Sequence, residues 1–357
     1  MKNDNAQALP IFVIQWHVTA LCDQACKHCY MVNSPEEHKR ELLNELSLSD
    51  CKAIIDSLME FCELAKARPA INFTGGDPLL RKDFFEILEY AHAKNIRLSI
   101  MGNPFHLTAE NIARMKSLGV VSYQVSLDGM MATHDYLRKP GSFHKTVKAI
   151  KLLLAYEMRA VVMFTLSKLN SNELPRVMSL VAKLGVNAFA FARLSSNPII
   201  DTKISPEETF APQEYREFLL KIQRVIKAIN GNGSKTHFTL KDHLWTLLLY
   251  EQGKYTPPVD NAGKVVTGCH MGEHNLALLA DGTVYACRRF HSPIGKMPQQ
   301  SVLEVFTSDA MDCYRDIKKF EKCSNCPLLC HCRGCPAVAA GASNGNFYAP
   351  DPQCWRE

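Results

Sequence analysis

The chain has 357 residues, of which 46% are hydrophobic and 22% are charged, and its formal net charge is +5. These values are ordinary for a globular protein and exclude wholesale disorder. The charge is mild and no block of Lys or Arg stands out, so nucleic acid is not indicated. No apolar run approaches the roughly 18 residues of a membrane span, and Ile11–Ile14 is too short for a secretion signal, so we expect a cytoplasmic protein without a membrane partner.

Strand–helix alternation dominates the first 200 residues, where six short β-rich apolar runs are separated by stretches of helical periodicity. Repeated units of this kind predict a parallel sheet with helices outside and a functional site at the carboxyl ends of the strands. Six units are too few for a closed eight-stranded barrel, so we expect an open, partial (β/α)6 barrel. The expected strands are Ile11–Val18, Ala70–Thr74, Arg97–Met101, Ser122–Leu127, Ala160–Leu166 and Ala188–Arg193, and the expected helices are 48–65, 82–94, 108–117, 142–157 and 172–184.

The pattern changes after residue 200. A helix is expected at 212–230, and a short apolar helix near 242–250 lies between loop signals. From residue 266 the chain is rich in cysteine and loops, and Asp281-Gly282 between two apolar runs predicts a β-hairpin. We therefore predict a partial barrel over 1–200, a helical bridge over 201–265 and a small cysteine-rich domain over 266–357.

Fourteen cysteines are the unusual feature of the composition. In a reducing compartment, such a number indicates metal binding rather than disulfides. Cys51 and Cys62 follow the apolar stripe of the helix expected at 48–65, so we expect both to be buried core residues.

The first cysteine group has the spacing C-x3-C-x2-C, formed by Cys22, Cys26 and Cys29 just after the first expected strand. Three thiolates on one tight loop suit a 4Fe–4S cluster that leaves one iron free. A free coordination position is the mark of a functional metal site. A zinc site completed by His28, or three unligated core cysteines, are the alternatives.

At this motif the chain resembles the radical S-adenosylmethionine (radical SAM) superfamily, over its first 200 residues. In that family the same motif follows strand one of a partial barrel and holds a 4Fe–4S cluster whose unique iron is chelated by S-adenosylmethionine. One electron cleaves the sulfonium and releases a 5′-deoxyadenosyl radical. The resemblance implies S-adenosylmethionine as cofactor, hydrogen abstraction from a substrate, and a one-electron donor such as flavodoxin or ferredoxin as partner.

A second motif follows the second expected strand. Thr74-Gly75-Gly76-Asp77-Pro78 is similar to the family's GGEP motif, which meets the methionine amino group. Asp77 stands where Glu is usual, which weakens a side-chain role but leaves the close backbone approach that glycines allow. Taken alone, the two glycines would be read as an ordinary turn.

Later motifs follow the fourth and fifth expected strands. Ser126 and Asp128 are similar to the family segment that holds the ribose, and Arg138 is similar to an arginine that pairs with the methionine carboxylate. Thr165 and Ser167 end the fifth strand, where polar side chains would face the cofactor. A helix cap and a surface salt bridge are the alternatives for these residues taken singly.

The C-terminal cysteines resemble a SPASM domain, an extension that carries auxiliary 4Fe–4S clusters in radical SAM enzymes. Only two residues separate Cys332 from Cys335, where the SPASM pattern usually has three. Seven of these cysteines would hold two clusters, and the second cluster then lacks a fourth ligand, which could be Cys313, Cys330 or a thiolate of the substrate. A zinc ribbon at 323–335 is the alternative to both clusters. The resemblance implies one auxiliary cluster on Cys323, Cys326, Cys332 and Cys354 and another on Cys269, Cys287 and Cys335.

The resemblance also implies a substrate class. SPASM enzymes mostly modify ribosomal peptides or proteins, so we expect a peptide or protein maturase that forms crosslinks or thioethers or oxidises a residue. No catalytic side chain beyond the cluster is predicted. Epimerisation is disfavoured because it needs a hydrogen donor, commonly a cysteine, and none lies between Cys62 and Cys269. A radical SAM enzyme acting on a small molecule such as a tetrapyrrole side chain, and a non-catalytic Fe–S or zinc scaffold, remain as alternatives.

Overall fold

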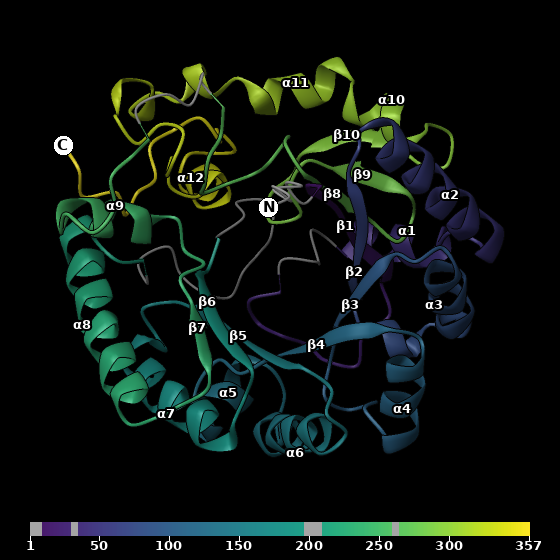
Figure 1. Ribbon diagram of the computed structural model, residues 1–357, viewed down its shortest axis with the longest axis horizontal. Coiled ribbons are helices and arrows are strands. Elements are labelled where there is room, and N and C mark those ends of the chain that lie inside the picture. The colour runs from purple at the N-terminus through teal and green to yellow at the C-terminus, as the bar shows by residue number, and fades with distance from the viewer. Residues whose placement is uncertain (1–8, 30–34, 196–208, 259–263) are drawn as a thin grey trace, which may run out of the picture.

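A single curved sheet organises the molecule (Figure 1). The structure, a computed structural model, describes residues 9–29, 35–195, 209–258 and 264–357. Within these ranges the strand order is β10-β9-β8-β1-β2-β3-β4-β5-β6-β7, with β8 and β1 to β7 parallel and β8, β9 and β10 antiparallel. The strands are β1 (Ile11–Thr19), β2 (Arg68–Gly75), β3 (Arg97–Met101), β4 (Val120–Ser126), β5 (Ala160–Leu166), β6 (Ala188–Arg193), β7 (His237–Thr239), β8 (Asn275–Leu278), β9 (Thr283–Tyr285) and β10 (Pro293–Lys296).

Helices of the first 250 residues wrap the outer side of this sheet, whereas the C-terminal helices lie at one end of the ring (Figure 1). The helices are α1 (Pro35–Leu43), α2 (Leu48–Leu64), α3 (Phe84–Ala93), α4 (Ala109–Ser117), α5 (Met131–Leu137), α6 (Ser142–Ala155), α7 (Leu174–Leu184), α8 (Pro212–Gly231), α9 (Leu244–Glu251), α10 (Val302–Phe306), α11 (Asp309–Arg315) and α12 (Pro336–Ala342). No helix among the described residues is long and apolar enough to cross a bilayer.

Alternation along β1 shows why the sheet folds with this register. Phe12, Ile14, Trp16 and Val18 are buried on one face, and the Phe12 ring centroid lies 4.6 Å from that of Phe61 on α2. A slip of one residue would move these apolar side chains to the inner face, so burial fixes the pairing. The expected open α/β barrel with a C-terminal hairpin is confirmed. Cys51 and Cys62 are buried in the core, as expected.

Two pairings were not predicted. Strand β7 lies in the segment that we expected to be a helical bridge, and it extends the parallel sheet beyond β6. Strand β8 pairs in parallel with β1, so the cysteine-rich hairpin continues the barrel sheet through backbone hydrogen bonds. The three residues of β7 carry too little periodicity for detection in the sequence, whereas β8 was expected as one strand of the hairpin and only its pairing with β1 was not. The boundaries proposed for the three parts stay a prediction.

Candidate active site

The loop after β1 brings Cys22, Cys26 and Cys29 to one cavity. The three thiols act on one another electrostatically. Burial raises the pKa of Cys22 and raises the pKa of Cys26 to about 12, so both sulfurs carry protons until a metal displaces them. Three sulfurs that share one cavity fit a 4Fe–4S cluster, which thiolates hold. His28, the fourth ligand of the zinc alternative, lines the same cavity; its Nε2 lies 3.1 Å from the Asp128 carboxylate, and its buried Nδ1 has no hydrogen-bond partner among the described residues.

The cavity, about 280 Å³ in volume, lies at the carboxyl ends of β1 to β5. Its lining includes five of the predicted cofactor-binding residues: Gly75, Gly76, Ser126, Arg138 and Thr165. Four others, Asp77, Pro78, Asp128 and Ser167, do not line it. Residues that the sequence did not single out also contribute to the wall: Ala20, Gln24, His38, Glu41, Met101, Gly102, Asn103, Gln124 and Met163.

The glycines after β2 lie against the cysteine loop. A Cβ atom at Gly75, whose φ is +138°, would lie 2.2 Å from the Thr19 carbonyl oxygen, and one at Gly76 would lie 1.9 Å from the Leu21 carbonyl oxygen. The Gly76 N–H donates to that Thr19 oxygen at 2.9 Å. Glycine is therefore required for the cysteine loop to approach β2, in addition to any contact with a ligand.

Asp128 does not line the cavity, and its carboxylate is bound by residues that do. The Arg138 Nε donates to Asp128 Oδ2 at 2.5 Å, and the Thr165 N–H donates to Oδ1 at 2.7 Å. Burial alone would raise the pKa of Asp128, but the Arg138 guanidinium and then His28 hold it well below its ordinary value. Asp128 therefore orients Arg138 and His28, while Arg138 also approaches Cys26 Sγ at 3.8 Å.

Ser167 also differs from expectation. It is buried, and its backbone N–H donates to Asn170 Oδ1 at 2.9 Å. The Asn170 amide in turn donates to the carbonyl oxygens of Asp128 and Thr165, at 2.9 and 2.8 Å. The polar residues after β5 thus join the ends of two strands, and of the predicted pair only Thr165 reaches the cavity.

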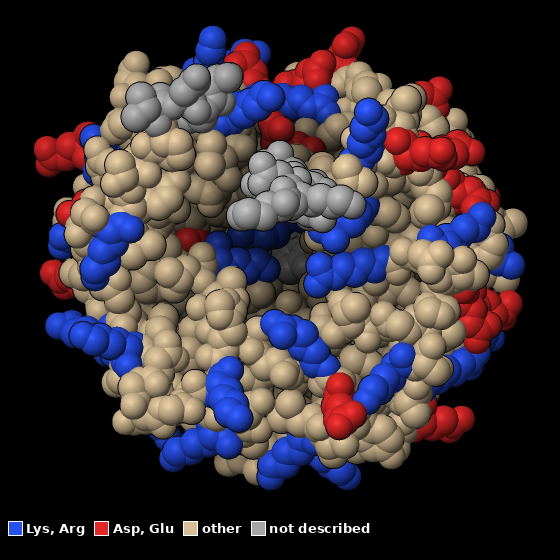
Figure 2. Space-filling model, in the orientation of Figure 1, with Lys and Arg blue, Asp and Glu red and all other residues tan. Residues whose placement is uncertain are grey.

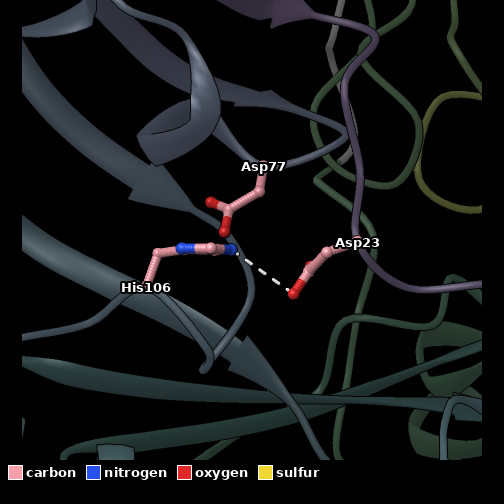
Figure 3. A group of neighbouring side chains, drawn as sticks. All are labelled: Asp23, Asp77 and His106. Atoms are coloured by element: carbon pink, nitrogen blue, oxygen red, sulfur yellow. Dashed lines mark ion pairs between the residues drawn. The ribbon is translucent and has the colours of Figure 1, made fainter.

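Asp77 lies beside a second polar group rather than at the cavity (Figure 3). Its Oδ1 accepts the Leu79 N–H at 3.3 Å, as an N-cap, and its buried Oδ2 has no hydrogen-bond partner. His106 Nε2 lies 3.3 Å from Asp23 Oδ2, and the ligand atoms of the three residues lie within 4.8 Å of one another. Burial raises the pKa of Asp77 to about 6. The shorter side chain thus turns into the protein, so only the backbone of this motif remains for a cofactor.

Replacing Asp77 with Asn should make the stability of the metal-free protein less dependent on pH. Because the folded-state pKa is about 6 and the ordinary value is 3.8, the wild type loses stability as pH rises between these values. At pH 8, Asp77→Asn should be more stable by on the order of 2 kcal/mol, and the difference should vanish toward pH 4. Urea unfolding at both pH values measures this. Asp312→Asn, at an exposed ion pair, is the control and should show no such trend.

Asn103 is a site residue that the sequence did not identify. It follows β3, and its side-chain amide lies 3.4 Å from Cys22 Sγ and 3.1 Å from Asp23 Oδ1. The only available signal was its position after the third expected strand, where no motif is present. Hydrogen bonds to sulfur are one determinant of cluster potential.

We expect Asn103→Ala to lower the midpoint potential of the N-terminal cluster, because the donor favours the more negative reduced state. A redox titration followed by electron paramagnetic resonance (EPR) measures this potential. Gln252→Ala, which removes an amide that pairs with Gln223 on the outer helices, should leave it unchanged. An unchanged potential in Asn103→Ala would show that the amide does not act on the cluster.

The C-terminal cysteines form two groups. Cys323, Cys326, Cys332 and Cys354 line a small cavity together with the cations Lys322 and Arg356. A zinc ribbon at 323–335 would use Cys335 as its fourth ligand, but Cys354 lines this cavity and Cys335 does not. Four thiols fit a 4Fe–4S cluster of about −2 charge. Arg333 and Asp351, which also line the cavity, add one charge of each sign, so the lining keeps two net positive charges that offset the cluster.

The second group is formed by Cys269, Cys287 and Cys335. The charges of these thiols influence one another's pKa, so the three lie close together. Burial raises the pKa of Cys269 to about 12. Cys313 is exposed on α11, with its Sγ 3.5 Å from the Asp309 carbonyl oxygen, and Cys330 is buried.

The short spacing before Cys335 is accommodated by the backbone. Arg333 and Gly334 both have left-handed conformations, with φ of 61° and 62°. A Cβ atom at Gly334 would lie 2.4 Å from the Asp351 Cβ, and Asp351 Oδ2 accepts the Cys335 N–H at 2.7 Å. This tight turn lets Cys332 and Cys335 lie in different cysteine groups although only two residues separate them.

Comparisons with known proteins agree with this arrangement. Residues 16–181 match the radical SAM superfamily, and residues 269–327 match SPASM, an iron–sulfur cluster-binding domain. The Fe-coproporphyrin III synthase of Methanosarcina barkeri is 26% identical over 363 residues, covering 96% of this chain and 87% of the relative. The AdoMet-dependent heme synthase of Nitratidesulfovibrio vulgaris is 27% identical over 351 residues, covering 96% and 91%.

A shorter match is to a protein named as a maturase. The mycofactocin maturase MftC of Mycobacterium tuberculosis is 30% identical over 174 residues, covering 48% of this chain and 42% of the relative. The crystal structure of Streptococcus suis SuiB bound to S-adenosylmethionine has a TM-score of 0.75 at 16% identity, covering 98% of this chain and 78% of SuiB, which shows a common fold. The chain belongs to the radical SAM superfamily and carries a C-terminal SPASM domain, and its cofactors are S-adenosylmethionine and 4Fe–4S clusters.

Proposed function

We propose that the protein cleaves S-adenosylmethionine reductively at the Cys22–Cys29 loop and abstracts a hydrogen atom from a substrate held at the carboxyl ends of the strands. The observation that carries this proposal is the cavity that three cysteines share with Gly75, Gly76 and Arg138. When bound, the cluster and S-adenosylmethionine supply the adenosyl radical. An external one-electron donor, of the flavodoxin or ferredoxin kind, would reduce the protein.

The residues of the chain would bind and orient the cofactor. The backbone at Gly75 and Gly76 offers peptide groups to an amino acid moiety. Arg138, fixed by Asp128, offers a guanidinium that suits a carboxylate. Ser126 and Thr165 offer hydroxyl groups to the polar part of the ligand. In place of the predicted role for Asp128, we assign the ribose contact to Ser126 and its neighbours.

A peptide or protein is the first candidate substrate. The match to MftC, a maturase by name, supports it, although that match covers 48% of this chain. The predicted chemistry would be a crosslink, a thioether or an oxidation.

A tetrapyrrole is the second candidate. It is supported by relatives named as heme and Fe-coproporphyrin III synthases, which match over 96% of the chain. The auxiliary clusters would carry electrons or hold part of the substrate in either case.

Anaerobic incubation with S-adenosylmethionine and dithionite tests the proposal. We expect 5′-deoxyadenosine to form, and deuterium from the true substrate to enter it. Coproporphyrin III deuterated on its propionate side chains and deuterated candidate peptides are supplied in separate reactions, with the mass of each substrate followed. Absence of 5′-deoxyadenosine from fully reconstituted protein would refute the enzymatic proposal.

A further inference from the structure

Three side chains converge at neighbouring strand ends, outside the S-adenosylmethionine cavity. We propose that Asp23, Asp77 and His106 form a binding site for a divalent transition-metal ion of the Mn²⁺ class, beside the N-terminal cysteine loop. None of the three residues lines the cavity, so this site is separate from the one described above and does not depend on the proposed function.

The sheet brings the three residues together. Asp23 follows β1, Asp77 follows β2 and His106 follows β3, and these three strands are neighbours in the parallel sheet. The ligand atoms of the three side chains lie within 4.8 Å of one another (Figure 3). An ion bound at about 2.0–2.2 Å holds its ligand atoms within about 4.4 Å of one another, so a small movement of the side chains closes the site.

Each carboxylate has one oxygen held by the protein and a second oxygen left for an ion. Asp23 Oδ1 accepts from the Asn103 amide at 3.1 Å, whereas Oδ2 lies 3.3 Å from His106 Nε2. Asp77 Oδ1 accepts the Leu79 N–H at 3.3 Å, whereas Oδ2 accepts no hydrogen bond from the described residues. Hydrogen bonds of this kind orient a carboxylate for coordination through its other oxygen.

Two buried atoms without hydrogen bonds point to a ligand. The Asp77 side chain is 0% exposed, and both its Oδ2 and the His106 Nε2 are buried atoms that form no hydrogen bond within the described parts of the chain. The contact between His106 and Asp23 is therefore electrostatic only. Leaving polar atoms buried and unpaired is costly, and a cation shared by these atoms and Asp23 Oδ2 would satisfy them.

The donor set favours a transition-metal ion. Two carboxylates and one imidazole suit Mn²⁺ or Fe²⁺, whereas Mg²⁺ and Ca²⁺ prefer sites made of oxygen alone. The side chains of Asp23 and His106 are 26% and 36% exposed, so water can complete the coordination. Zn²⁺ would also bind the thiols of the cysteine loop, which makes Mn²⁺ the more selective probe.

The charge of the site also favours a cation. Lys139 Nζ lies 3.8 Å from Asp23 Oδ2 and donates to the Asp23 carbonyl oxygen at 2.8 Å. Two carboxylates thus face one ammonium, and the neutral form of His106, which binds metals, adds no charge. The Asn103 amide that holds Asp23 also lies 3.4 Å from Cys22 Sγ, so an ion here would fix the cysteine loop against the ends of β2 and β3.

Titration of the full, reconstituted chain with Mn²⁺ tests the proposal without turnover. The protein is freed of loosely bound metal on a chelating resin, and its clusters are left oxidised, because that state has no EPR signal and free Mn²⁺ can then be measured alone. We expect one tightly bound Mn²⁺ per chain, with an affinity that falls at least tenfold in His106→Gln and in Asp77→Asn. Pulsed EPR of bound Mn²⁺ should show coupling to one imidazole nitrogen, which His106→Gln removes.

Weak binding at surface acids needs a control. Asp and Glu side chains lie mainly around the outer edge of the face in Figure 2, whereas Lys and Arg side chains border its central hollow. Asp316→Asn, at an exposed ion pair with Lys319, should keep the tight site. All variants are compared at equal iron content, so that loss of Mn²⁺ is not confused with loss of a cluster.

Four results would overturn the proposal. The wild type binds no Mn²⁺ tightly, His106→Gln and Asp316→Asn bind it with equal affinity, or the nitrogen coupling persists in His106→Gln. The fourth is release of bound Mn²⁺ on addition of S-adenosylmethionine, because it would show that the two carboxylates receive the ammonium group of the cofactor instead of a metal ion.

Discussion

Replacement of Cys22, Cys26 and Cys29 with Ala should abolish formation of 5′-deoxyadenosine, down to the level of a protein-free mixture. The thiols of this loop line the cavity with Arg138 and the two glycines, and no other cysteine lines it. The variant should also lose about four iron atoms per chain, because one 4Fe–4S cluster can no longer be held. Iron and sulfide analysis and chromatography of the nucleoside products measure both effects.

Cys62→Ala is the matched control for this prediction. Cys62 lies on the buried face of α2 and does not line the cavity, so its variant should keep the iron content and the nucleoside product. Full activity in the triple variant would refute the assignment of the cluster to this loop. Loss of iron in Cys62→Ala would show that the analysis reports unfolding instead of ligand removal.

Asp351→Ala should cause the largest loss of stability. The Asp351 carboxylate accepts from Arg193 through both oxygens, at 2.7 and 2.8 Å, and both side chains are buried. Asp242 still compensates the charge of Arg193 in the variant, at 2.7 Å, but buried N–H groups of Arg193 and Cys335 lose their acceptor, which costs about 3 kcal/mol. The variant also loses the acceptor for the Cys335 N–H, so iron in the auxiliary clusters should fall as well. Urea unfolding of the metal-free protein measures the first effect, and iron analysis measures the second.

A surface pair supplies the comparison. Lys168 and Glu214 form an ion pair at 2.9 Å in which both side chains are exposed, so Lys168→Met should change the free energy of unfolding by no more than about 0.5 kcal/mol. A combined Arg193→Met and Asp351→Ala variant should cost less than the sum of its parts, because both single changes already break the same two hydrogen bonds. A cost for Asp351→Ala as small as that for Lys168→Met would contradict a structural role for the buried pair.

The arrangement of the barrel was predictable because it follows from local patterns. The burial of alternate residues along β1 and the apolar stripe of α2, with Cys51 and Cys62 on it, are visible as spacings in the sequence. The same holds for the cysteine loop, since three thiols within eight residues after a strand lie near the strand's end in any fold. Gly75 and Gly76, which contribute backbone atoms to the site, could also be identified because they are glycines.

The directions of side chains were not predictable in this way. Asp77 and Asp128 have the residue type of ligands, yet the first turns toward His106 and the second is bound by Arg138. Asn103 carries no motif, although its amide lies at a cluster sulfur. The direction of each of these side chains depends on a partner residue at the end of another strand. The sequence does not indicate which partner a side chain contacts.

The sequence by itself therefore determined the parallel barrel, the cysteine loop after its first strand and the cysteine-rich hairpin, because each depends on spacing within a short segment. Tertiary structure alone decided that Arg193 and Asp351 pair, that β8 joins β1, and that Arg289 contacts Cys335. These contacts join segments separated by as many as 262 residues of chain, and folding brings them together because burial of the sheet faces fixes where each strand ends. Local motifs thus predict the chemistry of the site, whereas the positions of its charged side chains depend on the tertiary structure.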